Sequence, residues 1–121
     1  MPHPFDHFRS SVIQYEALIE ILPYVDIIEA FNARNLLLRD SQKAGRFAVE
    51  HGKLMAAGSD SHASVELGSV FVELPEFQGP EEFLQALRQS RIIGKRSNPL
   101  VHLLSRYAKI RKTLLPSSPR I

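Results

Sequence analysis

Two short apolar runs, at residues 26–31 and 53–57, are separated by a stretch of chain that ends at Gly52. The first run is β-branched at its centre, as is typical of a buried strand. A helix is predicted between the runs up to His51, with Gly52 just after the helix end, where glycine is favoured. A strand, a helix and a second strand in this order predict an α/β domain with a largely parallel sheet.

Further predicted elements continue this alternation on both sides of the central unit. Ser11 and Gln14 fit a capping box, in which two side chains satisfy backbone amides at a helix start. Residues 116–121 are expected to be a frayed tail, and no linker or repeat divides the chain, so residues 1–121 are predicted to form one domain. The other predicted elements are a helix over 12–22, a strand over 69–74, a helix over 79–89, a strand over 91–94 and a helix over 98–115.

The composition restricts the kinds of site that the chain can build. It contains no cysteine, so any metal must take nitrogen and oxygen ligands. No run reaches the roughly 18 apolar residues of a membrane span, and the start lacks the features of a secretory signal, so a cytoplasmic protein with no membrane partner is expected. The net charge of +2 predicts no polyanion partner, but the basic stretch from Arg106 to Lys112 leaves nucleic-acid binding open as an alternative.

The sequence Gly58-Ser59-Asp60-Ser61-His62 follows the second apolar run. Residues two apart on a strand point to the same face, so Asp60 and His62 can present a carboxylate oxygen and an imidazole nitrogen to one point. Ligands bind at the carboxyl ends of strands in parallel α/β domains, and these donors suit zinc, manganese or iron. A turn cap and a solvated histidine are the alternative interpretation. Three further histidines have no partner in the sequence that fixes a role: His7, His51 and His102.

Other residues are candidates for the same edge of the sheet. His3 lies between two prolines, which restrict its conformation. Asn32 and Arg34 follow the strand over 26–31 and can face the same opening, where a guanidinium suits a phosphate group. A loop amide and a surface charge are the alternative. Glu29 lies within that strand, and its carboxylate is open to interpretation as part of a structural ion pair or as a ligand.

Four segments, taken in order, resemble the C-terminal half of the PHP superfamily, named for polymerase and histidinol phosphatase. They are the stretches from Pro2 to Asp6, from Ile28 to Arg34, from Gly58 to His62 and from Gly68 to Leu74. The resemblance covers nearly the whole chain. It implies half of a distorted, TIM-like β/α barrel with mostly parallel strands and outer helices. It also implies that His3, Asp60 and His62 are ligands of a divalent metal, namely zinc, manganese or iron.

Members of this family begin with a His-x-His strand and carry a further His and a Glu before the His-Pro motif, and these are not in this chain. A barrel of this kind needs about twice this length. The resemblance implies a metal-dependent phosphoesterase that requires an N-terminal half from a separate polypeptide, a longer parent or a second copy. Its substrate would be a phosphorylated small molecule or a nucleic-acid phosphate, contacted by Arg34 and Asn32. The alternative is a non-catalytic metal-binding or association module. Exposed strand edges predict a homo-oligomer in either case.

Overall fold

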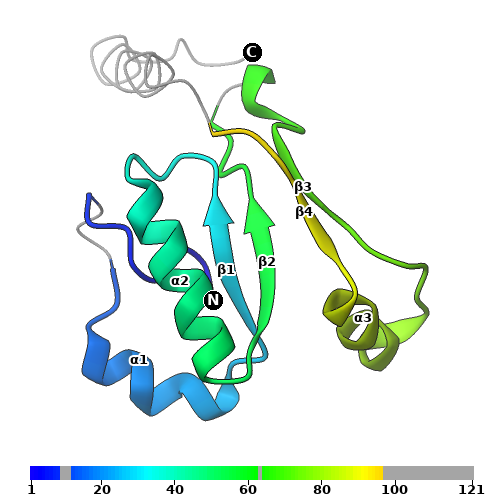
Figure 1. Ribbon diagram of the computed structural model, residues 1–121, viewed down its shortest axis with the longest axis horizontal. Helices are drawn as coiled ribbons and strands as arrows, with labels where there is room; N and C mark the ends of the chain where they lie inside the picture. Colours follow the sequence, from blue (N-terminus) through cyan, green and yellow to red (C-terminus); the bar gives the residue numbers. More distant parts are fainter. Residues whose placement is uncertain (9–11, 63, 97–121) are drawn as a thin grey trace, which may run out of the picture.

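The centre of the fold is a parallel pair of strands joined by a helix, in a computed structural model that describes residues 1–8, 12–62 and 64–96. Strand β1 (Ile27–Asn32), helix α2 (Leu38–Glu50) and strand β2 (Leu54–Gly58) follow one another in the chain. The strands pair in parallel, and α2 packs against them (Figure 1). The βαβ unit expected from the two apolar runs is therefore present, and the α/β class is confirmed.

The hydrophobic core lies between α2 and the parallel pair. Alternate residues of β1 are buried, beginning with Ile28. On α2 the buried apolar residues are Ala44, Phe47 and Ala48, which share one helix face because they are three and four positions apart. The Phe5 ring meets Phe47 edge-on, with 5.3 Å between ring centroids. The N-terminal segment therefore closes one side of this core.

Helix α1 (Tyr15–Ile21) and the short 3-10 helix η1 (Leu22–Tyr24) occupy the segment expected to be a helix over 12–22. Leu18 and Leu22 from this segment are buried in the core. The start differs from the capping-box prediction, because the helix begins after Gln14, which makes no side-chain capping bond. Ser11 lies outside the described residues. The spacing of apolar residues therefore predicted the helix correctly, whereas the capping motif predicted its first residue wrongly.

The first residue of the chain runs along the outer edge of β1. The amine of Met1 donates to the carbonyl oxygen of Ile27 at 2.7 Å, and the backbone N–H of Glu29 donates to the carbonyl oxygen of Met1 at 2.8 Å. This pair of bonds is the parallel pattern, with Met1 opposite Ile28. The edge of β1 away from β2 is thus occupied at this one position, and His3 is delivered beside Glu29.

A second, antiparallel pair corrects the prediction of mostly parallel strands. Strand β3 (Val70–Glu73) pairs with β4 (Arg91–Gly94), and helix α3 (Gly79–Arg88) connects them at the far end (Figure 1). Gly94 has φ +149, and a Cβ there would collide with the backbone of Val70. A strand's residue pattern does not encode the direction of its partner, and here the chain after α3 returns along β3. The described residues contain no barrel.

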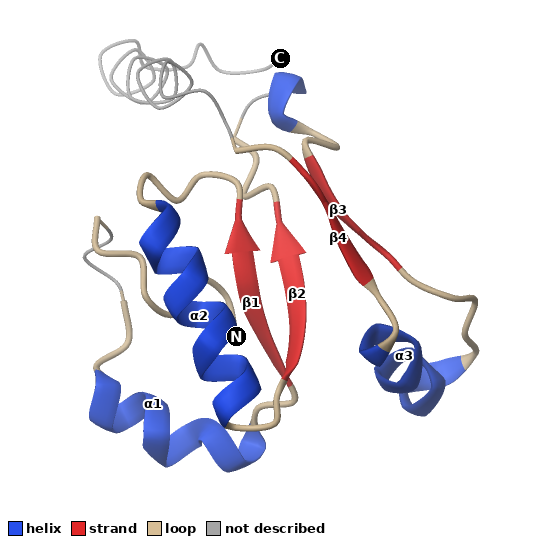
Figure 2. Cartoon of the chain, in the orientation of Figure 1, coloured by secondary structure: helices blue, strands red, loops and turns tan. Residues whose placement is uncertain are grey.

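The β3–β4 ribbon lies beside β2, whereas α1 and α2 lie on the other side of the parallel pair (Figure 2). Along the chain, a short 3-10 helix, η2 (Ser64–Glu66), follows β2 and precedes β3. The helix predicted over 98–115 and the tail over 116–121 lie outside the described residues. Within the described part of the chain, the helices are all too short or too polar to cross a membrane.

Candidate functional site

The candidate site lies where β1 and β2 end. The strands are parallel, and Asn32 at the end of β1 pairs with Gly58 at the end of β2, so both carboxyl ends meet at one edge. The Asn32 side-chain nitrogen lies 3.3 Å from Glu29 Oε2 and 3.5 Å from Asp60 Oδ2. The structure therefore brings Asn32 and Asp60 together at the edge that the sequence pattern indicates. It adds Glu29 to them.

The Glu29 carboxylate is held by hydrogen bonds from a backbone amide and a side-chain amide. The backbone N–H of His3 donates to Glu29 Oε2 at 2.6 Å, in addition to the Asn32 amide. An unbroken strand would put Glu29 and Asn32 on opposite faces because they are three positions apart. A register irregularity lies between Glu29 and Phe31, and such bulges re-aim side chains.

Gly58 makes room for the Glu29 carboxylate. A Cβ built on Gly58 would lie far inside contact distance of Glu29 Oε1. Because Gly58 has no side chain, the Glu29 carboxylate of the neighbouring strand can reach the edge. Any larger residue at this position must push that carboxylate aside.

Asp60 and His62 are held together by a turn. Both follow the end of β2, so the argument from side chains alternating along a strand does not apply to them. Asp60 has φ +50, a left-handed conformation that aspartate tolerates better than most residues. His62 Nδ1 lies 2.7 Å from the carbonyl oxygen of Asp60 and 3.9 Å from its Oδ1.

The hydrogen bond from His62 defines which ring nitrogen is available for binding. A carbonyl oxygen only accepts hydrogen bonds, so Nδ1 of His62 carries the proton that it donates to Asp60. In the neutral ring, Nε2 then keeps its lone pair and can act as a metal ligand. The His62 side chain is 56% exposed, which leaves this nitrogen accessible.

His3 shares an unusual backbone conformation with Asp60. In the described part of the chain, these are the two non-glycine residues with positive φ, at +26 for His3 and +50 for Asp60. Such conformations cost about 1–3 kcal/mol each and persist where surrounding contacts impose them. Both residues are ones that the family resemblance assigns to the metal.

Arg34 is buried rather than open to a ligand. It is 8% exposed, and its Nη1 lies 2.9 Å from Glu66 Oε2. Glu66 is 2% exposed, and the same oxygen accepts the backbone N–H of His62 at 3.0 Å. Arg34 is thus linked to the His62 loop indirectly, because both bond to the same oxygen of Glu66. Sequence reasoning missed Glu66, because a glutamate 32 positions away from its partner leaves no local signal.

A second polar pair that the sequence did not reveal ties the N-terminal segment to α2. Asp40 is 1% exposed, and its two oxygens accept the ring Nδ1–H of His7 at 2.7 Å and the His7 backbone N–H at 3.2 Å. Asp40 lies in the first turn of α2, where a negative charge is favoured by the helix dipole. This contact holds the segment that follows His3.

The donors at the edge are of the kind a divalent metal takes, but they are too few for a complete site. Within residues 1–8, 12–62 and 64–96, no three His, Asp or Glu side chains form a group that could hold a metal ion. Asp60 and His62 stand together as two such donors, while His3 is anchored at Glu29. The described residues therefore do not form a metal-binding group by themselves.

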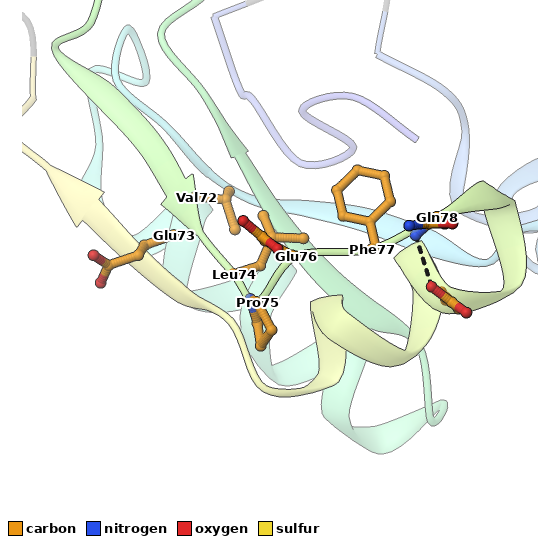
Figure 3. A pocket seen from close by; sticks show the side chains of 8 residues that line it. Val72, Glu73, Leu74, Pro75, Glu76, Phe77 and Gln78 are labelled. Atoms are coloured by element: carbon orange, nitrogen blue, oxygen red, sulfur yellow. Dashed lines mark hydrogen bonds between the residues drawn. The ribbon is translucent and has the colours of Figure 1, made fainter.

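A separate surface hollow lies away from this edge. It is lined by residues from the end of β3 to the start of α3, Val72 to Gln78, and by Glu82 (Figure 3). Its glutamates are partly engaged, since Glu82 accepts the Gln78 backbone N–H at 2.7 Å and Glu73 pairs with Arg91 at 2.9 Å. None of the residues assigned to the candidate site lines this hollow.

Comparison with known proteins places part of the chain in a family. Residues 39–92, which include all but the first residue of α2 together with β2, Asp60, His62 and Glu66, match the family model described as PHP-associated. An uncharacterized protein of Methanocaldococcus jannaschii is 35% identical over 98 residues, in an alignment that covers 73% of this chain and 41% of the relative. The chain thus spans about two fifths of that relative's length. No solved structure gives a significant match. The family relationship indicated by the motifs is confirmed, and residues 39–92 of this chain belong to the PHP-associated family.

Proposed function

We propose that this chain contributes the C-terminal part of a PHP-type, metal-dependent phosphoesterase. The observation that carries the proposal is the strand edge where Asp60, His62 and Asn32 meet, next to the anchored His3 segment. The PHP-associated match over residues 39–92 supports it, because that range contains the Asp-x-His motif. In this proposal the parallel pair is a piece of a distorted β/α barrel completed by an N-terminal half.

The proposed metal ligands are His3, Asp60 and His62, and the ion is zinc, manganese or iron. The Nε2 atom of His62 and a carboxylate oxygen of Asp60 supply one nitrogen and one oxygen, which these metals accept. The ligands still needed come from the N-terminal half, supplied by a separate polypeptide, a longer parent or a second copy. A bound divalent ion would lower the pKa of a water molecule and neutralise phosphate oxygens.

The proposed substrate is a phosphorylated small molecule or a nucleic-acid phosphate. Asn32 lies beside Asp60 at the edge, but it is 1% exposed, and its side chain bonds to Glu29, to Asp60 and to the backbone N–H of Arg34. Arg34 faces the same edge from a buried position and is paired with Glu66, so a direct phosphate contact would require this ion pair to open. We therefore propose that Asn32 and Arg34 contact a substrate phosphate only after their side chains leave these partners. A cytoplasmic location remains part of the proposal.

The test uses the purified full chain with zinc or manganese and a generic phosphomonoester, alone and with the N-terminal half of a PHP protein. We expect metal uptake by titration calorimetry and, once the half is supplied, turnover that His62→Ala abolishes. His51→Ala is the matched control, because His51 is exposed at the end of α2 and lies outside the site. If the wild-type chain takes up no metal and shows no turnover in either arrangement, the phosphoesterase proposal fails.

A second candidate function is a non-catalytic association module. The observation in its favour is the β3–β4 ribbon, in which every residue of β4 is exposed and Phe71 on β3 is 50% exposed. Metal uptake without turnover in the presence of the N-terminal half, together with stable self-association, would favour this candidate. Nucleic-acid binding through Arg106 to Lys112 concerns residues outside the described part. It predicts retention on a polyanion column that weakens when those cations are neutralised.

A further inference from the structure

We infer that Glu29 and Glu66 are positioning residues for the segments that carry His3 and His62. Each carboxylate accepts the backbone N–H of one histidine, His3 for Glu29 and His62 for Glu66. The importance of these histidines rests on the proposed function, whereas the contacts are features of the fold itself. The two segments lie far apart in the sequence, and each is fixed to the same edge by one carboxylate.

Glu66 connects the loop after β2 to Arg34. Its Oε2 is shared by the Arg34 guanidinium at 2.9 Å and the His62 backbone N–H at 3.0 Å, and the residue is almost completely buried. Hydrogen bonds that involve a charged partner are shorter and stronger than neutral ones. Arg34 offsets the cost of burying the carboxylate, and Glu66 in turn holds the backbone from which the His62 ring projects.

Glu29 supports the other two proposed ligands, one directly and one through an amide. It binds the His3 backbone, and the Asn32 side chain continues the contact from Glu29 to Asp60. His3 and Asp60 are also the two described non-glycine residues with positive φ. Because such a conformation must be imposed by neighbouring contacts, this network accounts for how both residues are held.

The first test is amide hydrogen exchange by NMR on the metal-free full chain. In Glu66→Ala, we expect the protection of the His62 amide to fall about tenfold relative to the Leu54 amide, since one charge-assisted bond is lost. Leu54 donates to the Asp26 carbonyl at 3.0 Å and reports on the opposite end of the strand pair. Glu66→Gln retains an acceptor oxygen and should restore part of the protection.

This ratio remains informative even if a variant is less stable, because global unfolding lowers both amides together. Glu73→Ala is the matched control, since Glu73 pairs with Arg91 on the surface and should leave the ratio unchanged. An unchanged His62 to Leu54 ratio in Glu66→Ala would overturn the role assigned to Glu66. For Glu29, the same measurement on the His3 amide is made in Glu29→Ala and in Gly58→Ala, which displaces the carboxylate without removing it.

The second test is titration of zinc alone into the same variants. Loss of a residue that orients a ligand typically weakens metal binding 10- to 100-fold, and we expect a loss in this range for Glu29→Ala and Glu66→Ala. Zinc affinity equal to wild type in both would overturn the positioning role. If the wild-type chain alone binds no zinc, the titration is repeated with the N-terminal half supplied, and no binding in either arrangement counts against the proposed function. The exchange ratios decide separately whether the two carboxylates hold the histidine segments.

Discussion

Glu29, Asn32 and Glu66 hold the polar residues at the carboxyl ends of β1 and β2. These side chains bond to backbone amides and to one another, so they stabilise the edge. Arg34 belongs to the same set, because its guanidinium completes the environment of a buried carboxylate. Of the two donors after β2, His62 has the more exposed side chain, at 56% against 18% for Asp60.

Asp40 shows at the same scale how a single side chain fixes the N-terminal segment. We expect Asp40→Ala to lower the free energy of unfolding by about 2 kcal/mol, since it removes two hydrogen bonds from a buried carboxylate to His7. Asp26→Ala is the control, because Asp26 is exposed. Urea unfolding followed by circular dichroism measures both, and equal stabilities of the two variants would contradict the prediction.

The two glycines Gly94 and Gly45 are predicted to respond to alanine in opposite directions. Gly94→Ala should destabilise the fold by about 2–3 kcal/mol, because its φ is positive and a Cβ would meet the Val70 backbone. Gly45 lies within α2 with no atom near its missing Cβ, so Gly45→Ala should stabilise by about 0.5–1 kcal/mol. The midpoints of urea unfolding test the pair, and a shift in the same direction for both would refute it.

At the scale of elements, α2 is joined to the parallel pair by one apolar face. Phe47 is central to this face because it also meets Phe5 from the N-terminal segment and Tyr15 from α1. The helix therefore connects the segments on which the candidate site depends. By contrast, Val49 on the outer face of the helix is 68% exposed and is not part of the core.

Phe47→Ala is expected to cost about 3–5 kcal/mol, because it leaves a cavity between α2, α1 and the N-terminal segment. Val49→Ala on the same helix should change stability by less than about 0.5 kcal/mol. Equilibrium unfolding in guanidinium chloride compares the two. A similar cost for both substitutions would show that the core does not lie on the Phe47 face.

For the whole molecule, two small sheets take the place of a continuous one in the described residues. The β3–β4 ribbon has only two strands, and such a ribbon is marginal unless something packs against it. Strand β4 also leaves Ile92 and Ile93 partly exposed. An exposed, apolar edge strand is a template for pairing with another chain, so self-association is expected at this scale.

We expect light scattering at micromolar concentration to give a mass above the 13.7 kDa of one chain. Ile93→Lys should shift the protein toward the monomer, because a charge on the outer strand opposes edge pairing. Gln85→Lys adds the same charge on an exposed position of α3 and serves as the control. A monomeric wild-type protein, or equal masses for both variants, would count against association through this strand.

The local patterns in the sequence predicted the elements well but not all of their relations. The strand expected over 26–31 is β1 (Ile27–Asn32), and the helix expected over 79–89 is α3 (Gly79–Arg88). The capping box misplaced the start of α1, and the prediction of mostly parallel strands was wrong for the antiparallel β3–β4 pair. Apolar spacing reports on which face of an element is buried, and it contains no information about which strand that element will pair with.

The sequence by itself determined the βαβ unit, the PHP-associated match over residues 39–92 and the residue types available at the strand edge, because these depend on local periodicity and on short motifs. The tertiary structure alone decided how the edge is held. Glu66 meets Arg34 across 32 positions, and Asp40 meets His7 across 33. Such contacts exist only once separate segments have packed, since a buried carboxylate takes whichever donors the fold brings to it.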